Sequence, residues 1–321
     1  MKAIRVHTFG GPEVLTLDEI PVPQPGPGQV LVRIQAIGVN FIDIYHRTGL
    51  YKADPPITLG MEAAGVVEAV GEGFTQLAPG DRIAYCMTRG SYAEYAVIPA
   101  WQAIQIPDSL DFESAAAALL QGMTAHYLTH STFELKPGDT ALVHAGGGGT
   151  GRLIVQMAKM RGARVIATTS SAAKAEIVRR TGADEIILYT QQDFQAEVKR
   201  LTDGRGVDVV YDSVGASTFD GSLNSLRPRG MMVTFGNASG PVPPIEPLVL
   251  SQKGSLFLTR PTLFAYCATP EELRWRASDV LNWIAQGKLT LHIEKVYPLA
   301  QAAQAHLDLA SRKTTGKLLL K

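Results

Sequence analysis

Cysteine is nearly absent from this sequence. The chain has 321 residues and two cysteines, Cys86 and Cys267. Two thiols cannot build a framework of several disulfides or a zinc site with four cysteine ligands. One disulfide between them is arithmetically open, but two free thiols in a reducing compartment is the interpretation that we favour.

The chain also lacks an excess of charge of either sign. It has 30 Lys and Arg against 30 Asp and Glu, which gives a formal net charge of zero. Binding to a nucleic acid requires a surplus of positive charge on some face of the protein. The balance therefore argues against a nucleic acid as the main partner.

Long hydrophobic runs are missing as well. The longest block of Ala and Leu, Ala115–Leu120, is far too short to cross a bilayer. The N-terminus has no apolar signal core before the turn at Gly10–Pro12. We therefore expect no membrane partner and a cytoplasmic location.

The first third of the chain is rich in glycine, proline and short β-like runs. Short strands bounded by turn residues, without long helical periodicity, predict a small antiparallel barrel or sandwich. The expected strands are Lys2–Val6, Val30–Ile37, Gly65–Val70, Arg82–Tyr85 and Tyr92–Val97.

From Thr140 onward, short apolar runs alternate with helical segments. Strands that are apolar throughout, joined by helical crossovers, predict an α/β domain with a parallel sheet covered on both faces. Six such strands make a full doubly wound domain. The expected strands are Thr140–Ala145, Arg164–Thr169, Glu185–Tyr189, Val207–Asp212, Met231–Phe235 and Ser255–Leu258, and the expected helices are Gly151–Arg161, Ala172–Arg180, Asp193–Leu201 and Ser217–Leu226.

The C-terminal segment is too short to form a domain of its own. It contains a long amphipathic helix over Pro270–Gln286, a second helix over Ala300–Leu309 and a final strand over Lys317–Leu320. We expect it to return to the N-terminal part. The expected domains are residues 1–122 with 263–321, and residues 123–262.

A glycine loop follows the first strand of the expected parallel sheet. Gly146, Gly148 and Gly151 match the pattern G-x-G-x-x-G between that strand and an apolar helix. Glycine at these positions permits a tight turn, close approach of a pyrophosphate and close packing of helix on strand. The helix N-terminus then favours the phosphates. A purely structural turn would match the same pattern, but the flanking strand and helix favour a dinucleotide site.

The second strand of that sheet indicates which dinucleotide binds. NAD sites place an acidic residue where this strand ends, and here the chain has hydroxyls and Lys174 instead. Such groups suit the 2′-phosphate of NADPH. Ser170 or Ser171 would also serve as the N-cap of the next helix, and the two roles are compatible.

Motifs along the whole chain resemble one enzyme family. They are Gly10–Leu15, Ala36–Asp43, Gly60–Val67, Pro79–Arg82, the glycine loop, Tyr211–Gly215, Phe235–Gly240 and Thr259–Pro261. Together they are similar to the quinone oxidoreductases, the zinc-independent branch of the medium-chain dehydrogenase/reductase superfamily. The resemblance implies a GroES-like β-rich catalytic domain, a Rossmann domain, a cofactor cleft between the two domains and a homodimer. One departure lies in the glycine loop, where Thr150 takes the place of the family's valine.

The resemblance also argues against a metal. Zinc enzymes of the superfamily have a cysteine at the position of Asn40 and a histidine at that of Met61, so the catalytic zinc ligands are missing here. Asp43 and Glu62 alone are poor zinc ligands. His126 and His130 lie four apart but lack the glutamate of a metalloprotease motif, so we expect packing or solvent-exposed roles for them and no bound metal.

Family positions that contact NADPH can be carried over to this sequence residue by residue. Asn40, Tyr45 and Tyr51 match the substrate pocket, and Tyr45 is the candidate for orienting or protonating a carbonyl. Asp43 could equally make an internal hydrogen bond or ion pair, and both tyrosines could be core residues. The cofactor residues implied by the resemblance are Asn40, Phe41, Asp43, Tyr45, Thr124, Gly147, Gly148, Gly149, Thr150, Ser171, Lys174, Tyr189, Ser213, Phe235, Ser239, Gly240, Pro261, Thr262, Leu263 and Arg312.

The function implied by this resemblance is NADPH-dependent reduction of a quinone or a related conjugated carbonyl. Reduced quinone oxygens can be protonated by solvent, so no strong protein acid is required. An enone or 2-alkenal reductase is the nearest alternative, and it would need a proton donor for the α-carbon. A crystallin-like or RNA-binding role is a third, disfavoured by the charge balance and by the whole set of cofactor residues.

Overall fold

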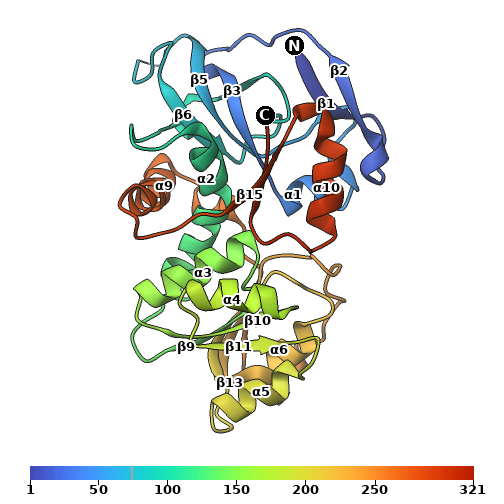
Figure 1. Cartoon of the computed structure of the whole chain (residues 1–321), viewed down its shortest axis with the longest axis vertical. Helices are drawn as coiled ribbons and strands as arrows, with labels where there is room; N and C mark the ends of the chain where they lie inside the picture. The colour runs from blue at the N-terminus through green and yellow to red at the C-terminus, as the bar shows by residue number, and fades with distance from the viewer. Residues whose placement is uncertain (74) are drawn as a thin grey trace. The chain divides into compact units, whose positions relative to one another are not determined.

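The computed structural model describes residues 1–73 and 75–321, and the chain divides into two compact units (Figure 1). Unit 1 contains Met1–Met123 and Cys267–Lys321, and unit 2 contains Thr124–Tyr266. Sequence analysis placed the junctions at 122/123 and 262/263, whereas the contacts of the chain place them at 123/124 and 266/267.

The described part of unit 1 is built on two sheets. The smaller sheet has the strand order β2-β1-β4 and the larger one β15-β16-β3-β5-β6-β8, with β7 paired to β3. Most of its strands pair antiparallel, as expected for this part of the chain, but β15 and β16 are parallel. The strands are β1 Lys2–Val6, β2 Leu15–Glu19, β3 Gln29–Val39, β4 Ile57–Thr58, β5 Glu62–Val70, β6 Arg82–Cys86, β7 Tyr95–Pro99, β8 Ile104–Gln105, β15 Ile293–Tyr297 and β16 Lys317–Leu320.

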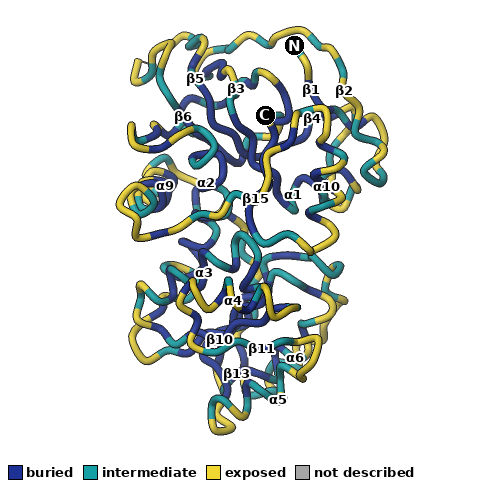
Figure 2. Tube along the Cα trace, in the orientation of Figure 1, coloured by how far each residue is buried: buried dark blue, intermediate teal, exposed yellow. Residues whose placement is uncertain are grey.

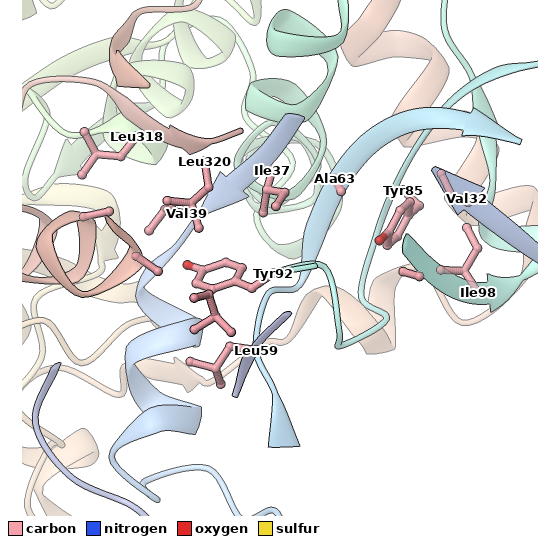
Figure 3. Packing of buried hydrophobic residues seen from close by; sticks show 14 of the residues in the cluster. Val32, Ile37, Val39, Leu59, Ala63, Tyr85, Tyr92, Ile98, Leu318 and Leu320 are labelled. Carbon is pink, nitrogen blue, oxygen red and sulfur yellow. The ribbon is translucent and has the colours of Figure 1, made fainter. Parts of the chain in front are cut away.

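The last strand of the chain lies inside the larger sheet. β16 pairs antiparallel with β3, so that Leu318 faces Val39 and Leu320 faces Ile37 in the register. All four residues of β16 are buried. Figure 3 shows Leu318 and Leu320 beside Val39 in the apolar cluster of this unit. Burial of three consecutive leucines supplies the hydrophobic driving force that holds the C-terminus here.

Four helices accompany these strands in the described part of unit 1. α1 begins directly after β3, and α2 begins in unit 1 and ends in unit 2. The N-terminus of α9 is capped by Thr269, whose side chain accepts from the backbone N–H of Glu272. The helices are α1 Phe41–Arg47, α2 Phe112–Tyr127, α9 Pro270–Ala285 and α10 Ala302–Ala310; Leu128–Thr132 after α2 is a π-helical turn, and Pro12–Val14, Ala100–Gln102 and Leu299–Gln301 are 3₁₀ turns.

Unit 2 is a doubly wound α/β domain. Its six strands are all parallel and have the order β11-β10-β9-β12-β13-β14. This is the Rossmann order 3-2-1-4-5-6 when the strands are numbered along the chain. The prediction of a six-stranded Rossmann sheet is therefore confirmed. The strands are β9 Thr140–Val143, β10 Arg164–Thr169, β11 Glu185–Leu188, β12 Val207–Asp212, β13 Leu226–Thr234 and β14 Phe257–Thr259.

Helices follow the strands of unit 2 along the chain. β9 and β12 are buried at every position, because a parallel sheet with both faces covered leaves no residue facing water. Figure 2 shows dark blue, buried segments around β10 and β13, and yellow, exposed segments in the outer parts of this unit. The helices are α3 Gly149–Met160, α4 Ala172–Arg180, α5 Phe194–Leu201, α6 Phe219–Ser225, α7 Leu248–Gln252 and α8 Leu263–Tyr266.

The structure differs from the sequence predictions mainly in unit 1. The first third of the chain has no long helical periodicity, yet the segment after Asn40 is the helix α1. The strand expected from Tyr92 begins only at Tyr95, because the backbone of Tyr92 pairs with Leu59 instead. The helix expected over Ser217–Leu226 is shorter, and Leu226 already belongs to β13.

None of the helices in residues 1–73 and 75–321 is long and apolar enough to span a bilayer.

Candidate functional site

The glycine loop of unit 2 is held at the carboxyl ends of three neighbouring strands. It leaves β9 through His144, whose backbone N–H donates to the carbonyl of Tyr211 at the end of β12. The N–H of Gly146 donates to the carbonyl of Thr168 in β10 at 3.0 Å. Ala145 between them adopts a left-handed conformation with φ of 52°. The loop therefore lies where open parallel sheets bind ligands.

Two of the loop glycines are required by close packing. A Cβ on Gly151 would lie 2.2 Å from the carbonyl oxygen of Ala145, and one on Gly146 would lie 2.9 Å from the Cβ of Ala167. Glycine at these positions lets α3 start close to the sheet, with Gly148 as its N-cap. The first turn of a helix leaves its N–H groups without intrahelical partners. These amides, together with the helix dipole, fit a pyrophosphate.

The residues predicted for the 2′-phosphate and adenosine gather at the ends of β10 and β11. Ser171 caps α4, and its Oγ accepts from the backbone N–H of Lys174 at 3.3 Å. A Cβ on Gly147 would lie 3.3 Å from the Cβ of Lys174, so Lys174 flanks the glycine loop. Tyr189 follows β11, donates its N–H to Thr169 and is 48% exposed. The capping role of Ser171 is thus confirmed.

The predicted residues after β12 and β13 also come together. The hydroxyl of Ser239 donates to the carbonyl of Val214 at 2.8 Å, and a Cβ on Gly215 would lie 2.6 Å from the carbonyl of Gly240. The N–H of Phe235 donates to the carbonyl of Asp212 at 2.8 Å. The turns after the two strands are thus fastened to each other. Ser213 lies in this pair of turns, Pro261 and Thr262 follow β14, Leu263 opens α8, and Thr124 lies in the last turn of α2.

A buried polar network that the sequence patterns do not indicate lies next to the glycine loop. His144 Nδ1 lies 3.0 Å from Thr168 Oγ1, and His144 Nε2 lies 2.9 Å from Ser222 Oγ. Ser222 donates its one hydroxyl hydrogen to Asp212 at 3.1 Å, so it accepts from Nε2–H of the histidine. Burial lowers the pKa of His144, which therefore stays neutral. The network fixes the ends of β9, β10 and β12 relative to one another.

In unit 1, the predicted residues after β3 form the first turn of α1. The carboxylate of Asp43 is buried, and its Oδ2 accepts from the backbone N–H of Asn40 at 2.8 Å and from the hydroxyl of Tyr92 at 3.0 Å. Burial raises the pKa of Asp43 to about 7. The internal hydrogen-bonding role considered for Asp43 is thus present in the structure.

The aromatic residues predicted near the substrate are neighbours. The rings of Phe41 and Tyr45 lie 6.3 Å apart, and those of Tyr45 and Tyr51 lie 5.2 Å apart. His46 packs edge-on against Tyr51 at 5.8 Å. Tyr45 is buried, whereas Phe41 and Tyr51 are partly exposed. Arg312, the last predicted residue, follows α10 with a left-handed backbone conformation and an exposed side chain.

Two further charged residues beside Asn40 were not among the predicted site residues. Lys317 Nζ lies 2.6 Å from Glu62 Oε2 and 2.7 Å from Asn40 Oδ1. Both charged side chains are buried. The signal in the sequence is slight: a lysine directly before three leucines in a strand.

The positions considered for metal binding have other contacts. The imidazole rings of His126 and His130 stack at 4.3 Å, and Met61 is buried. Within residues 1–73 and 75–321, no group of three or more His, Cys, Asp or Glu side chains could hold a metal ion. Both cysteines in this part of the chain are free and buried.

Two known families match different parts of the chain. Residues 26–108 match the alcohol dehydrogenase GroES-like domain, and residues 149–282 match the zinc-binding dehydrogenase family. A quinone oxidoreductase of Pseudomonas aeruginosa is 46% identical over 99% of each chain. The chain belongs to the quinone oxidoreductase family. It is accordingly an oxidoreductase of the medium-chain dehydrogenase/reductase superfamily.

Two other members of this wider group bear on the activity. A 2-haloacrylate reductase of a Burkholderia species is 43% identical and covers 98% of this chain and 97% of its own. The crystal structure of Escherichia coli quinone oxidoreductase complexed with NADPH has a TM-score of 0.98 at 42% identity. The alignment with that structure covers 100% of this chain and 99% of the other.

Proposed function

We propose that this oxidoreductase takes electrons from NADPH and reduces a quinone. The choice of cofactor rests on the residues that follow β10. Ser171 and Lys174 occupy this segment, where NAD sites have an acidic residue. A hydroxyl at a helix N-cap and an ammonium group suit the charge of a 2′-phosphate. The NADPH complex of the E. coli relative supports the same cofactor.

Each group of predicted residues receives one part of the cofactor in this proposal. Gly147–Thr150 and the first turn of α3 hold the pyrophosphate. Ser171, Lys174 and Tyr189 bind the 2′-phosphate and adenosine, and Arg312 is a further basic residue for the cofactor. The turns with Ser213, Phe235, Ser239 and Gly240, the segment Pro261–Leu263, and Thr124 line the path toward the nicotinamide.

The first turn of α1 acts on the reacting end. NADPH, when bound, supplies the reducing equivalents. Phe41, Tyr45 and Tyr51 present an aromatic wall that suits a planar quinone. The hydroxyl of Tyr45 orients the carbonyl, and solvent protonates the reduced quinone. Asp43 supports this turn through its hydrogen bonds with the backbone N–H of Asn40 and the hydroxyl of Tyr92.

A second candidate activity is reduction of an activated carbon–carbon double bond. The similarity to the 2-haloacrylate reductase favours it, because that relative covers nearly the whole chain. This chemistry would use the same cofactor but needs a proton at the α-carbon. Tyr45 is the residue we assign to that step as well.

We also propose that the protein is a homodimer joined through β14. This strand is at the edge of the six-stranded sheet, with its outer backbone groups available for a second chain. Phe257 on the strand is 57% exposed, and Leu248 on the preceding helix is 55% exposed. Large exposed apolar side chains beside an open sheet edge are typical of an interface.

The decisive experiment measures oxidation of NADPH and NADH under anaerobic conditions with benzoquinone, phenanthrenequinone and a 2-alkenal in parallel. We expect quinone-dependent turnover that prefers NADPH. Turnover with the alkenal alone would move the activity to double-bond reduction. Equal use of NADH and NADPH would overturn the cofactor assignment, and no turnover with any acceptor would overturn the activity.

A further inference from the structure

Unit 1 contains an ion pair with almost no contact with water. Lys317 at the start of β16 and Glu62 at the start of β5 are joined at 2.6 Å, and their side chains are 2% and 0% exposed. The two residues are 255 positions apart in the sequence. Burying two charges is expensive, and apolar residues of the same size are often as stabilising or more so. The pair is therefore weak evidence for stability and invites another explanation.

The ion pair holds the carboxamide of Asn40 in one orientation. Lys317 Nζ can only donate, and it lies 2.7 Å from Asn40 Oδ1. Glu62 Oε2 accepts from Asn40 Nδ2 at 2.9 Å. The remaining amide hydrogen goes to the carbonyl of Gly38 at 3.2 Å, and Gln121 Nε2 approaches Oδ1 at 3.4 Å. These four contacts use the two donors and two acceptor sites of the carboxamide.

Asn40 therefore does not have spare hydrogen-bonding capacity for a ligand through its side chain, which is buried. What Asn40 does control is the start of α1. Its backbone N–H donates to Asp43 Oδ2 at 2.8 Å, and its carbonyl accepts from the N–H of Asp43 at 3.1 Å. Phe41 and Tyr45 lie one helical turn apart directly after this cap. The position of Asn40 therefore determines the positions of these two aromatic side chains.

The same carboxylate reaches a further element. Glu62 Oε1 accepts from the backbone N–H of Leu120 in α2 at 2.6 Å. A Cβ on Gly38 would lie 2.3 Å from Glu62 Oε2 and 2.6 Å from the carbonyl of Ala116 in α2, so β3 approaches this helix closely. The ion pair thus ties β16, β5 and α2 to the first residue before α1.

We propose that Lys317 and Glu62 are positioning residues that orient Asn40 and, through it, the first turn of α1 with Phe41 and Tyr45. This inference rests on the proposed function, in which Phe41 and Tyr45 line the acceptor site. Loss of the pair loosens α1 even where the rest of the fold remains intact.

The test uses the double variant Glu62→Gln with Lys317→Met, beside Lys317→Met alone. The single variant leaves a buried carboxylate without its cation, and we expect a fall in Tm of several degrees. The double variant has no unpaired charge, so most of that stability should return. Lys321→Met is the matched control, because Lys321 directly follows the same strand but its side chain is 62% exposed in its ion pair with Glu113.

Two measurements separate positioning from a purely structural role. In the double variant we expect the KM for the acceptor to be about tenfold above that of the wild type. A tenfold change corresponds to the free energy of one charge-assisted hydrogen bond. The dissociation constant of NADPH should be unchanged. We also expect faster amide hydrogen exchange in α1 than in the wild type and in Lys321→Met. Wild-type acceptor KM or wild-type exchange in α1, in a double variant with restored Tm, overturns the proposal.

The hydrogen-exchange measurement needs no acceptor. It therefore tests the positioning of α1 even if the wild-type protein reduces neither quinone nor alkenal, a result that would refute the proposed function instead. If the double variant does not fold, Glu62→Gln alone keeps the volume of the site but replaces two acceptor oxygens with one, so Asn40 Nδ2 and the N–H of Leu120 can no longer both be satisfied. Because this variant leaves the ammonium of Lys317 without its counterion, we expect a lower Tm here too. The same two measurements on that variant then decide the question.

Discussion

The hydroxyl of Tyr92 donates a hydrogen bond to Oδ2 of Asp43 at 3.0 Å, inside the core of unit 1. Figure 3 shows the ring of Tyr92 among apolar side chains, including Val39 and Leu59. Tyr92 is also 3.0 Å from Nε2 of His306, whose Nδ1 is 3.2 Å from the guanidinium of Arg47. A guanidinium only donates, so Nδ1 accepts and Nε2 carries the hydrogen. The hydrogen bonds therefore all point from Arg47 toward Asp43.

The direction of these hydrogen bonds determines which carboxyl oxygen of Asp43 can hold a proton. Its Oδ2 already accepts two hydrogen bonds, and its buried Oδ1 has no hydrogen-bond partner among the described residues. A protonated Asp43 consequently carries its hydrogen on Oδ1. Neutral Asp43 and neutral His306 thus form one consistent arrangement beneath α1.

The first prediction concerns the pH dependence that Asp43 imposes. Burial raises its pKa from 3.8 to about 7, so the folded state prefers the protonated acid. The stability that the protonated Asp43 contributes is complete when the pH is below 3.8, the pKa of this group in the unfolded state. It is lost as the pH rises through about 7, the pKa in the folded state. We expect Asp43→Asn, which stays neutral, to gain Tm relative to the wild type as the pH rises through this window. Asp108→Asn, at an exposed position, is the control; a difference in Tm between wild type and Asp43→Asn that is independent of pH would contradict the prediction.

His306 should have the opposite effect in acid. Burial lowers its pKa from 6.5 to about 3, so the folded state holds the neutral ring. This contribution is present above the unfolded value of 6.5 and is lost as the pH falls toward 3. His306→Gln should be less stable near neutral pH by about 1–3 kcal/mol because buried hydrogen bonds are lost. The difference in the free energy of unfolding between the wild type and His306→Gln should shrink as the pH falls. Chemical denaturation at several pH values measures this difference. A constant or growing difference would count against a neutral, buried His306.

Lys174 should discriminate between the two nicotinamide dinucleotides. It lies beside the glycine loop and the N-cap of α4, where we place the 2′-phosphate. Lys174→Met should weaken NADPH binding by about 1.5–3 kcal/mol, the worth of a hydrogen bond to a charged group, and leave NADH binding unchanged. Titration calorimetry with both dinucleotides measures this difference, with Lys136→Met at an exposed loop position as control. Equal losses for both cofactors would place the 2′-phosphate elsewhere.

Phe257 should be needed for dimerisation. A charge on the edge strand β14 would be buried without a partner in the proposed interface, which costs several kcal/mol. We expect Phe257→Asp to elute as a monomer in size-exclusion chromatography with light scattering, while the wild type elutes as a dimer. Phe9→Asp, at an exposed position in unit 1, should not change the elution. A wild-type monomer would refute the proposed homodimer outright.

Local pattern was sufficient for most of unit 2. The strands Arg164–Thr169 and Val207–Asp212 and the helix Ala172–Arg180 have the bounds expected from sequence. Buried parallel strands are continuous apolar runs, and the helices α4 and α5 begin with the capping residues Ser171 and Asp193, so these elements can be recognised within a short window. The same holds for the glycine loop, because its glycines, the strand before it and the helix after it are neighbours in sequence.

Unit 1 was less predictable because its elements depend on distant partners. The helix α1 is short and has no long apolar stripe of its own. Its N-cap is Asn40, whose side chain is held by Glu62 and Lys317. β15 has an exposed middle and forms by pairing with β16. Short elements of this kind are stabilised by tertiary contacts rather than by their own residues.

By itself, therefore, the sequence determined the two-part α/β architecture, the dinucleotide loop and the family, because apolar period, glycine spacing and linear motifs are local properties of the chain. Only the tertiary structure decided which buried polar groups meet. Lys317 with Glu62 and Arg47 with His306 are separated by 255 and 259 residues, and balanced composition does not predict such pairs. Burial then sets their chemistry, because a group removed from water keeps only the partners that the fold brings to it.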